Sequence, residues 1–401
     1  MSGAARVRAL LATITLGALA VPARPQSANL APGDKLCGVC KTTGRVPFEV
    51  PKAVLELEKG CLECSEVSDN KAINWGLDFA PCPKCLCPSL HDKVKAEWDG
   101  KVAARRDWLK AQREIDAFLN DPKDLRLMHV KTEHFDLCWS VPKIKVGNVV
   151  LDQHHAIHLY AQRLEEAYKT YLDQYGFKHE VEQNGVRHLV MVFEQLRHAN
   201  KAEPKYTGQG GQGTTNGVKL VGPKSVFCTH WNKTVNPDDE AFHEYLVHNV
   251  VHLFLASNYP NMLWLAKKNG WLDEGVSHYF TDKRFGKART HCYQEQDEAK
   301  QWVLTPWRPE VRKLVAIDKI PAFAEVVVKH GEELTAEEHM FVWSWVQYLN
   351  DAYDHAKFVA LISGLKEQKP LRDVLQEAYG VSMFQFLDKW KKYVLETYPP
   401  R

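Results

Sequence analysis

The most constraining feature of the chain is an apolar stretch that carries two histidines four positions apart. His248 and His252 lie in the run Leu246–Leu255, which is otherwise almost entirely aliphatic or aromatic. If this run is helical, the two imidazoles project from one face, one turn apart. That spacing suits two ligands of one tetrahedral metal ion, although the same pattern also arises by chance on apolar helices.

A carboxylate that could serve as a third metal ligand follows about twenty residues after His252. Residues 271–275 read Trp-Leu-Asp-Glu-Gly, and His278 comes shortly afterwards. Together with the paired histidines, this element resembles the gluzincin metallopeptidases, most closely the peptidase-MA-like domains of secreted bacterial proteins. The resemblance implies that His248, His252 and Glu274 bind one Zn²⁺. Glu244 and His278 are the candidates for side chains that support these ligands by hydrogen bonding.

The sequence departs from the family at the catalytic position. The family places a glutamate directly after the first histidine, as general base, and this chain has Asn249 there. A neutral amide cannot accept a proton from zinc-bound water at neutral pH. The family also places a Tyr or His in its helical lobe to stabilise the oxyanion. His339 is the candidate here, and Phe341 stands where a tyrosine is expected.

The order of elements predicts an α+β fold. A strand at 129–140, a helix at Asp152–Tyr175 ended by Gly176, and strands at 188–194 and within 218–229 precede the histidine helix. Mostly helical sequence follows, including expected helices at 337–353, 358–365, 371–378 and 383–395. This order resembles the thermolysin-like two-lobe gluzincin domain, a small mixed sheet with helices followed by a helical C-terminal lobe. We expect that domain at residues 125–397.

A cysteine-rich module precedes this domain, at residues 29–91. Three C-x-x-C pairs and two further candidates supply metal-binding side chains: Cys37, Cys40, Cys61, Cys64, Cys82, Cys85, Cys87 and His91. Pairs of this kind favour one or two structural Zn²⁺ ions, and the first resembles the knuckles of DnaJ-type domains. Either the first two pairs share an ion or the first and third pairs cross. Disulfides are the alternative, because cystines are the default in an oxidising compartment.

The N-terminus resembles a secretory signal. Residues 1–28 combine Arg6 and Arg8 with a short apolar stretch, and cleavage is expected after Ala23. A retained anchor is the alternative interpretation. We expect a secreted or otherwise extracytoplasmic protein with no transmembrane segment in the mature chain, in which a charged helix at 92–124 connects the two domains.

Charge and the remaining motifs limit the functional classes. Lys plus Arg total 52 against 50 Asp plus Glu, so no global field favours nucleic acid. The glycines of Gly208–Gly213 fit a dinucleotide-binding pattern only formally, because no strand and helix flank them. The resemblance keeps the three zinc ligands but has Asn249 in place of the base, and it therefore implies a zinc-binding pseudo-peptidase that binds a peptide or protein. The alternative is an active zinc metallopeptidase, or another hydrolase with a different general base. Neither substrate nor oligomeric state follows from the sequence.

Overall fold

The computed structural model divides the chain into two compact units, Met1–Lys131 with Gly147–Val149, and Thr132–Val146 with Val150–Arg401. It describes residues 35, 37–41, 43, 45–47, 79–82, 84–85, 87–119, 125–176, 187–207, 218–220, 225–257, 268–288 and 306–400. The predicted signal segment, Cys61, Cys64 and the glycine-rich loop Gly208–Gly213 lie outside these residues.

The first unit combines a short hairpin with one long helix. Strands β1 (Arg45–Pro47) and β2 (Phe79–Pro81) pair antiparallel, with Arg45 opposite Pro81. Helix α3 (Pro88–Leu119) begins four residues before the predicted start, at a proline, which is favoured in a first helical turn. Strand β3 (Met128–Lys131) follows α3 in this unit. An ion pair of 2.6 Å between Arg45 and Glu97 joins β1 to α3.

The second unit contains a small mixed sheet. Strands β4 (Phe135–Trp139), β7 (His188–Phe193) and β9 (Val226–His230) run parallel in this order, and β8 (Val218–Leu220) pairs antiparallel with β9. Most of these strand residues are buried, as expected for parallel strands covered on both faces. The strands predicted at 188–194 and within 218–229 are confirmed. The single strand predicted at 129–140 is wrong, because residues 132–134 interrupt it between β3 and β4, where the Thr132 amide donates a 2.9 Å hydrogen bond to the Phe135 carbonyl oxygen. Three elements were not predicted, namely the ribbon strands β5 (Lys143–Val146) and β6 (Val149–Asp152) and the helix α6 (Leu196–Thr207).

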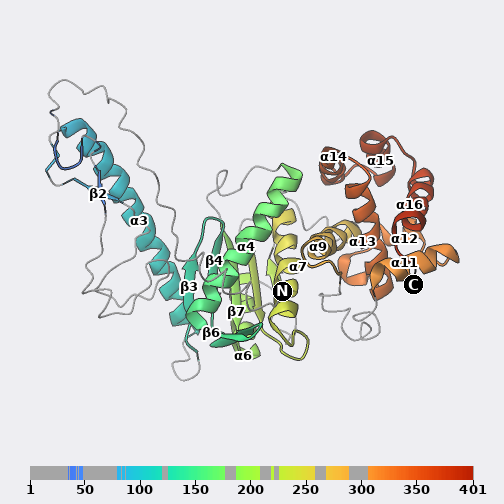
Figure 1. Ribbon diagram of the computed structural model, residues 1–401, viewed down its shortest axis with the longest axis horizontal. Coiled ribbons are helices and arrows are strands. Elements are labelled where there is room, and N and C mark those ends of the chain that lie inside the picture. The colour runs from blue at the N-terminus through green and yellow to red at the C-terminus, as the bar shows by residue number, and fades with distance from the viewer. Residues whose placement is uncertain are drawn as a thin grey trace. The chain divides into compact units, whose positions relative to one another are not determined.

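Helix α4 (Gln153–Tyr175) lies against the sheet and confirms the predicted helix closely. The Asp152 side chain accepts a hydrogen bond from the His155 amide at its start, and Gly176 ends it in the left-handed region with φ 64°. Helix α7 (Asp239–Ser257) packs beside α4, and the Tyr168 and Phe254 rings lie 4.8 Å apart, centroid to centroid. The helix that carries the paired histidines is therefore fixed between other packed elements (Figure 1).

The C-terminal part of the second unit is helical, as predicted. Helix α9 (Gly270–Phe285) carries Glu274. The elements that follow it are α11 (Trp307–Ala316), α12 (Phe323–Val326), the 3₁₀ turn η2 (Gly331–Glu333), α13 (Ala336–Asp351), α14 (His355–Lys366), α15 (Leu371–Tyr379) and α16 (Met383–Thr397). Reciprocal hydrogen bonds of Thr335 with Glu338 cap α13. The α+β class with a small mixed sheet is confirmed, whereas the specific two-lobe arrangement stays a prediction.

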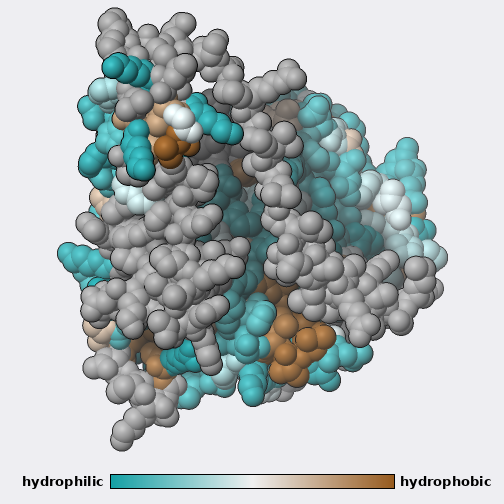
Figure 2. All heavy atoms as spheres, turned by 60° about the vertical axis from the view of Figure 1, so that its left-hand side comes forward, coloured by the Kyte–Doolittle hydropathy of each residue, from teal (hydrophilic) through white to brown (hydrophobic). Residues whose placement is uncertain are grey.

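On the face drawn in Figure 2, the surface of the described residues is mainly hydrophilic, with a few separate hydrophobic patches. The large apolar side chains that it exposes, such as Phe384 and Val328, come from separate elements. None of the helices in the described ranges combines the length and the apolar character needed to cross a bilayer.

Candidate metal centres

Helix α7 places His248 and His252 side by side in the interior. Its first turn carries Asp239, whose carboxylate accepts hydrogen bonds of 2.6 and 2.9 Å from Arg163 and one of 2.8 Å from the Tyr160 hydroxyl. A negative charge is favourable at this end of a helix. The two imidazoles are at most 3% exposed, and their Nε2 atoms lie 3.2 Å apart.

Helix α9 brings the carboxylate of Glu274 to these two nitrogens. Its Oε2 lies 3.5 Å from His248 Nε2 and 3.7 Å from His252 Nε2. A tetrahedral ion with bonds of about 2.1 Å spaces its ligand atoms about 3.4 Å apart. The three atoms therefore have the spacing of one face of a tetrahedral site, and the structure brings together the three side chains that the motif singles out.

Asp273 lies beside the other nitrogen of one of these imidazoles. Its Oδ1 lies 2.9 Å from Nδ1 of His252, which is the ring nitrogen opposite the one that faces Glu274. A carboxylate at this position fixes the tautomer of a metal-binding histidine and increases its basicity. The two neighbouring carboxylates thus approach His252 from opposite sides, since Glu274 Oε2 lies near Nε2 and Asp273 Oδ1 lies near Nδ1.

The glycine of the Trp-Leu-Asp-Glu-Gly element has a packing explanation. A Cβ atom on Gly275 would lie 2.6 Å from Val346 Cγ2 and 2.7 Å from the Val342 carbonyl oxygen. Helix α13 therefore approaches α9 at a distance that only glycine permits. This close approach brings α13, with its own histidine, to the same place as Glu274.

His278 and His339 complete a cluster of four imidazoles. His278 Nε2 lies 3.1 Å from His339 Nδ1, and each of these atoms lies 3.9 Å from Glu274 Oε2. The His278 ring is also 4.6 Å from the His248 ring, centroid to centroid. His248, Glu274 and His278 together form a group that could hold a metal ion, as do His252, Asp273 and Glu274.

The sequence contained only a partial signal for this larger cluster. Glu274 and His278 are four residues apart on one helix and so share a face, which favoured a supporting role for His278. His339 comes from a helix 61 residues farther along the chain, and no local pattern connects it to His278. The structure places both histidines within the cluster itself.

Asn249 is buried, and its amide binds its own helix. The side-chain Nδ2 donates a 2.8 Å hydrogen bond to the Tyr245 carbonyl oxygen, one turn earlier. Phe341, at the position expected for a tyrosine, packs in the aromatic core with Trp345 and Trp390 at centroid distances of 6.3 and 6.0 Å. Buried Glu244 has its Oε1 2.7 Å from Lys287 Nζ. Its predicted hydrogen bond to His248 stays a prediction.

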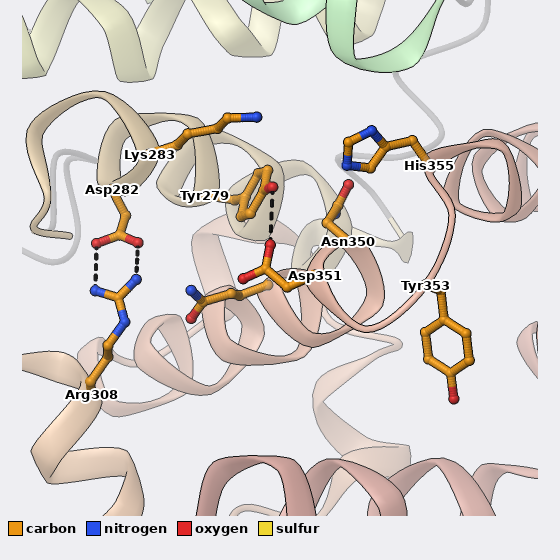
Figure 3. Close-up of a pocket in the computed structure, with 9 residues that line it drawn as sticks. Tyr279, Asp282, Lys283, Arg308, Asn350, Asp351, Tyr353 and His355 are labelled. Carbon is orange, nitrogen blue, oxygen red and sulfur yellow. Dashed lines mark hydrogen bonds and ion pairs between the residues drawn. The ribbon is translucent and has the colours of Figure 1, made fainter. Parts of the chain in front are cut away.

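A polar cavity of about 700 Å³ lies between α9, α11 and α13 and the start of α14 (Figure 3). The Arg308 guanidinium binds both carboxylate oxygens of Asp282 on one side, and the Tyr279 hydroxyl donates to Asp351 over 3.3 Å on the other. The pKa of Lys283 is lowered, because burial lowers it by more than the charge of Asp351 raises it. The cavity thus offers both charges and several hydrogen-bonding groups along the helices that carry Glu274 and His339.

Four cysteines of the first unit form a second cluster. Cys37 and Cys82 have their sulfurs 4.0 Å apart, and Cys40 and Cys85 have theirs 3.9 Å apart. A tetrahedron of Zn–S bonds of about 2.3 Å has edges of about 3.8 Å, so the spacing fits a metal site. The contacts join the first and third C-x-x-C pairs, which is the crossed arrangement. The cysteines within the described ranges are free thiols, and Cys37, Cys40 and Cys82 are recognisable as a metal-binding group.

Cys87 and His91 follow the third pair in the chain and make contacts of their own. The Cys87 sulfur lies 2.9 Å from the Lys35 carbonyl oxygen, and His91 Nδ1 lies 3.5 Å from Asp92 at the start of α3. Burial raises the pKa of the Cys82 thiol, and that of Cys85 to about 11. Without an ion these thiols are therefore protonated at neutral pH, and metal binding must displace their protons.

Comparison with known proteins adds no family to this picture. No protein-family model matches the chain, and no curated protein matches its sequence. The two clusters must therefore be interpreted from their own geometry.

Proposed function

We propose that the chain is a zinc-binding, metallopeptidase-like protein that binds a peptide or protein segment at the histidine cluster and hydrolyses it poorly. The observation that carries this proposal is the spacing of His248 Nε2, His252 Nε2 and Glu274 Oε2, at 3.2, 3.5 and 3.7 Å. These are the residues that the gluzincin resemblance assigns as ligands. Bound Zn²⁺ would act as a Lewis acid and lower the pKa of a coordinated water to about 7.

The missing general base supports a binding role. Asn249 occupies the family's position for the base, and its amide donates to the Tyr245 carbonyl. Two further carboxylates on these helices have other neighbours, since Asp273 lies at His252 and Glu244 at Lys287. Loss of a general base typically lowers a rate by about 10² to 10⁴.

The cavity of Figure 3 supports the choice of a peptide as the ligand. Lys283 and Arg308 supply cations, Asp351 supplies an anion, and Gln347 and Asn350 supply amides that can pair with a peptide backbone. Helices α9 and α13 supply side chains to both the cavity and the cluster, so a peptide held in the cavity would lie against the helices that carry Glu274 and His339.

One observation favours a second candidate function, that of an active hydrolase with a different proton acceptor. His278 and His339 lie 3.1 Å apart beside Glu274, and a neutral imidazole accepts protons near neutral pH. In that case His278 or His339 would act as the general base in place of the missing glutamate.

The test combines metal analysis with peptide cleavage. We expect the purified chain to contain zinc that His252→Ala removes in part, and to cleave unstructured peptides weakly. Asn249→Glu should increase cleavage about 10²-fold or more, whereas Asn249→Gln, of equal length but without the charge, should not. Robust cleavage by the wild type that His339→Asn abolishes would favour the active hydrolase. Zinc content unchanged by His252→Ala would contradict both functions.

A further inference from the structure

Two imidazole pairs flank one carboxylate oxygen in the histidine cluster. Helix α7 supplies the pair His248 and His252, and helices α9 and α13 supply the pair His278 and His339. Glu274 Oε2 lies 3.5 and 3.7 Å from the nitrogens of the first pair, and 3.9 Å from both nitrogens of the second. The five residues are at most 6% exposed.

Each pair forms a triangle with Glu274 Oε2 that fits one ion. In the first triangle, a point equally distant from the three atoms lies no closer than about 2.0 Å to each, and in the second no closer than about 2.1 Å. Both values agree with Zn–N and Zn–O bonds of about 2.0 to 2.2 Å. The second triangle is therefore as suitable for a divalent cation as the first.

We propose that the cluster binds two divalent cations that share the Glu274 carboxylate. His248 and His252 hold the first, and His278 and His339 hold the second. Only the first ion belongs to the proposed function, so the inference rests on that function and adds a second metal position. Two ions that share one carboxylate oxygen can lie about 3.5 to 4 Å apart, as they do in two-metal sites.

The charges indicate what the loaded cluster would bind. Asp273 and Glu274 supply two negative charges against the four positive charges of two divalent ions, and the imidazoles that coordinate them are neutral. A buried excess of positive charge is costly unless an anion compensates it. The open positions of the two ions therefore favour an anionic group, such as the carboxylate of a peptide.

The competing explanation is a simple hydrogen bond. A separation of 3.1 Å between His278 Nε2 and His339 Nδ1 also fits an N–H donor facing a ring-nitrogen acceptor. In that case the second pair would hold no ion. The number and the magnetic coupling of the bound ions distinguish the two explanations.

The decisive experiment is electron paramagnetic resonance of the full-length chain loaded with Co²⁺. Thiolate-bound Co²⁺ in the cysteine module is identified separately by its sulfur charge-transfer absorption. Two bridged ions in the histidine cluster should couple magnetically, so that their signal departs from that of isolated Co²⁺. Uncoupled Co²⁺ bound by nitrogen and oxygen would overturn the second site but leave the proposed function intact. Cobalt bound only by thiolate would overturn both.

Variants then assign each ion. His339→Asn should remove the coupling and about one equivalent of Co²⁺, and His252→Asn should remove the other equivalent. His243→Asn is the matched control, because His243 is a buried histidine on α7 that packs against Phe285 instead. It should retain both ions. Full cobalt content in folded His339→Asn would contradict the second site, and the wild-type spectrum decides the question if that variant does not fold.

Discussion

The two candidate metal clusters differ in what surrounds them. The histidine cluster lies on three packed helices, among rings such as Trp307, which is 5.0 Å from the His278 ring. In the cysteine cluster the buried core consists of the cysteines themselves, Cys37, Cys40 and Cys82, with Cys85 packed against them. The hairpin beside it has two strands of only three residues each.

This difference separates two uses of a metal ion. A short hairpin buries too little apolar surface to offset the conformational entropy of folding, so an ion there contributes directly to folding. The histidine helices have an aromatic core of their own, and an ion bound there would add chemistry to a site that is already formed. Metal should therefore be structural in the first unit and functional in the second.

Chelation should have the largest effect, and it should affect the folding of the two units differently. Removing zinc should unfold the cysteine hairpin, since structural Zn²⁺ contributes about 10 to 16 kcal/mol in comparable small modules. Hydrogen exchange of the full chain should show residues 37–47 and 79–87 losing protection, while α7, α9 and α13 keep theirs. Cys40→Ser is the control, because it should produce the same pattern without a chelator. Equal loss of protection in both units would refute the distinction.

A single methyl group should test whether the histidine site is preformed. In Gly275→Ala the new Cβ would meet Val346 and the Val342 carbonyl at 2.6 and 2.7 Å, so α9 must move away from α13. We expect a loss of about 1 to 3 kcal/mol in the free energy of unfolding, measured with urea, together with weaker zinc binding.

Gly100→Ala is the matched control in the first unit. Nothing lies within 4 Å of a Cβ at this position on α3, so the substitution should stabilise its helix by about 0.5 to 1 kcal/mol. If Gly275→Ala leaves both stability and zinc affinity unchanged, the close approach of α9 and α13 is not what holds the site together.

The sequence predicted the elements that carry strong local signals. Helix α4 was predicted almost to the residue, because Asp152 and Gly176 mark its two ends. The spacing of His248 and His252, and Glu274 after Trp271, were enough to single out three side chains that the structure brings together. The short ribbon β5–β6 and helix α6 were missed, because neither has a clear period in its sequence.

The rest of the site depends on contacts that a sequence does not show. His339 meets His278 because Gly275 allows two helices to approach closely, and this follows from packing rather than from spacing. The crossed pairing of Cys37 with Cys82 and of Cys40 with Cys85 is equally non-local, and spacing alone allowed another pairing. Local patterns thus identified ligand types, and tertiary packing determined which of them share a site.

The orientation of His252 provides a smaller test of the functional role. Asp273→Asn keeps the shape of the side chain but removes the charge that lies 2.9 Å from His252 Nδ1. Loss of such a partner typically weakens metal binding about 10- to 100-fold. Competition with a chromophoric chelator should show this decrease, while exposed Asp388→Asn on α16 should bind zinc as the wild type does. An unchanged affinity would mean that Asp273 does not position this ligand.

Acid should lower the stability of the fold by a smaller amount that does not depend on metal. The group responsible is His243, on the helix that carries His248 and His252. Burial, with help from the positive charges of Arg163 and Arg284, lowers the pKa of His243 to about 2. Below about pH 6.5 the unfolded chain therefore binds a proton at this histidine that the folded chain does not bind. Stability should fall with decreasing pH, by about 1.4 kcal/mol per pH unit from this group alone, down to about pH 2. The measurement is urea unfolding of chelated protein between pH 6 and 4, because protons also compete with metal for the ligands. His243→Asn should show a slope smaller by one proton, and an unchanged slope would show that His243 is not held neutral by its buried position on α7.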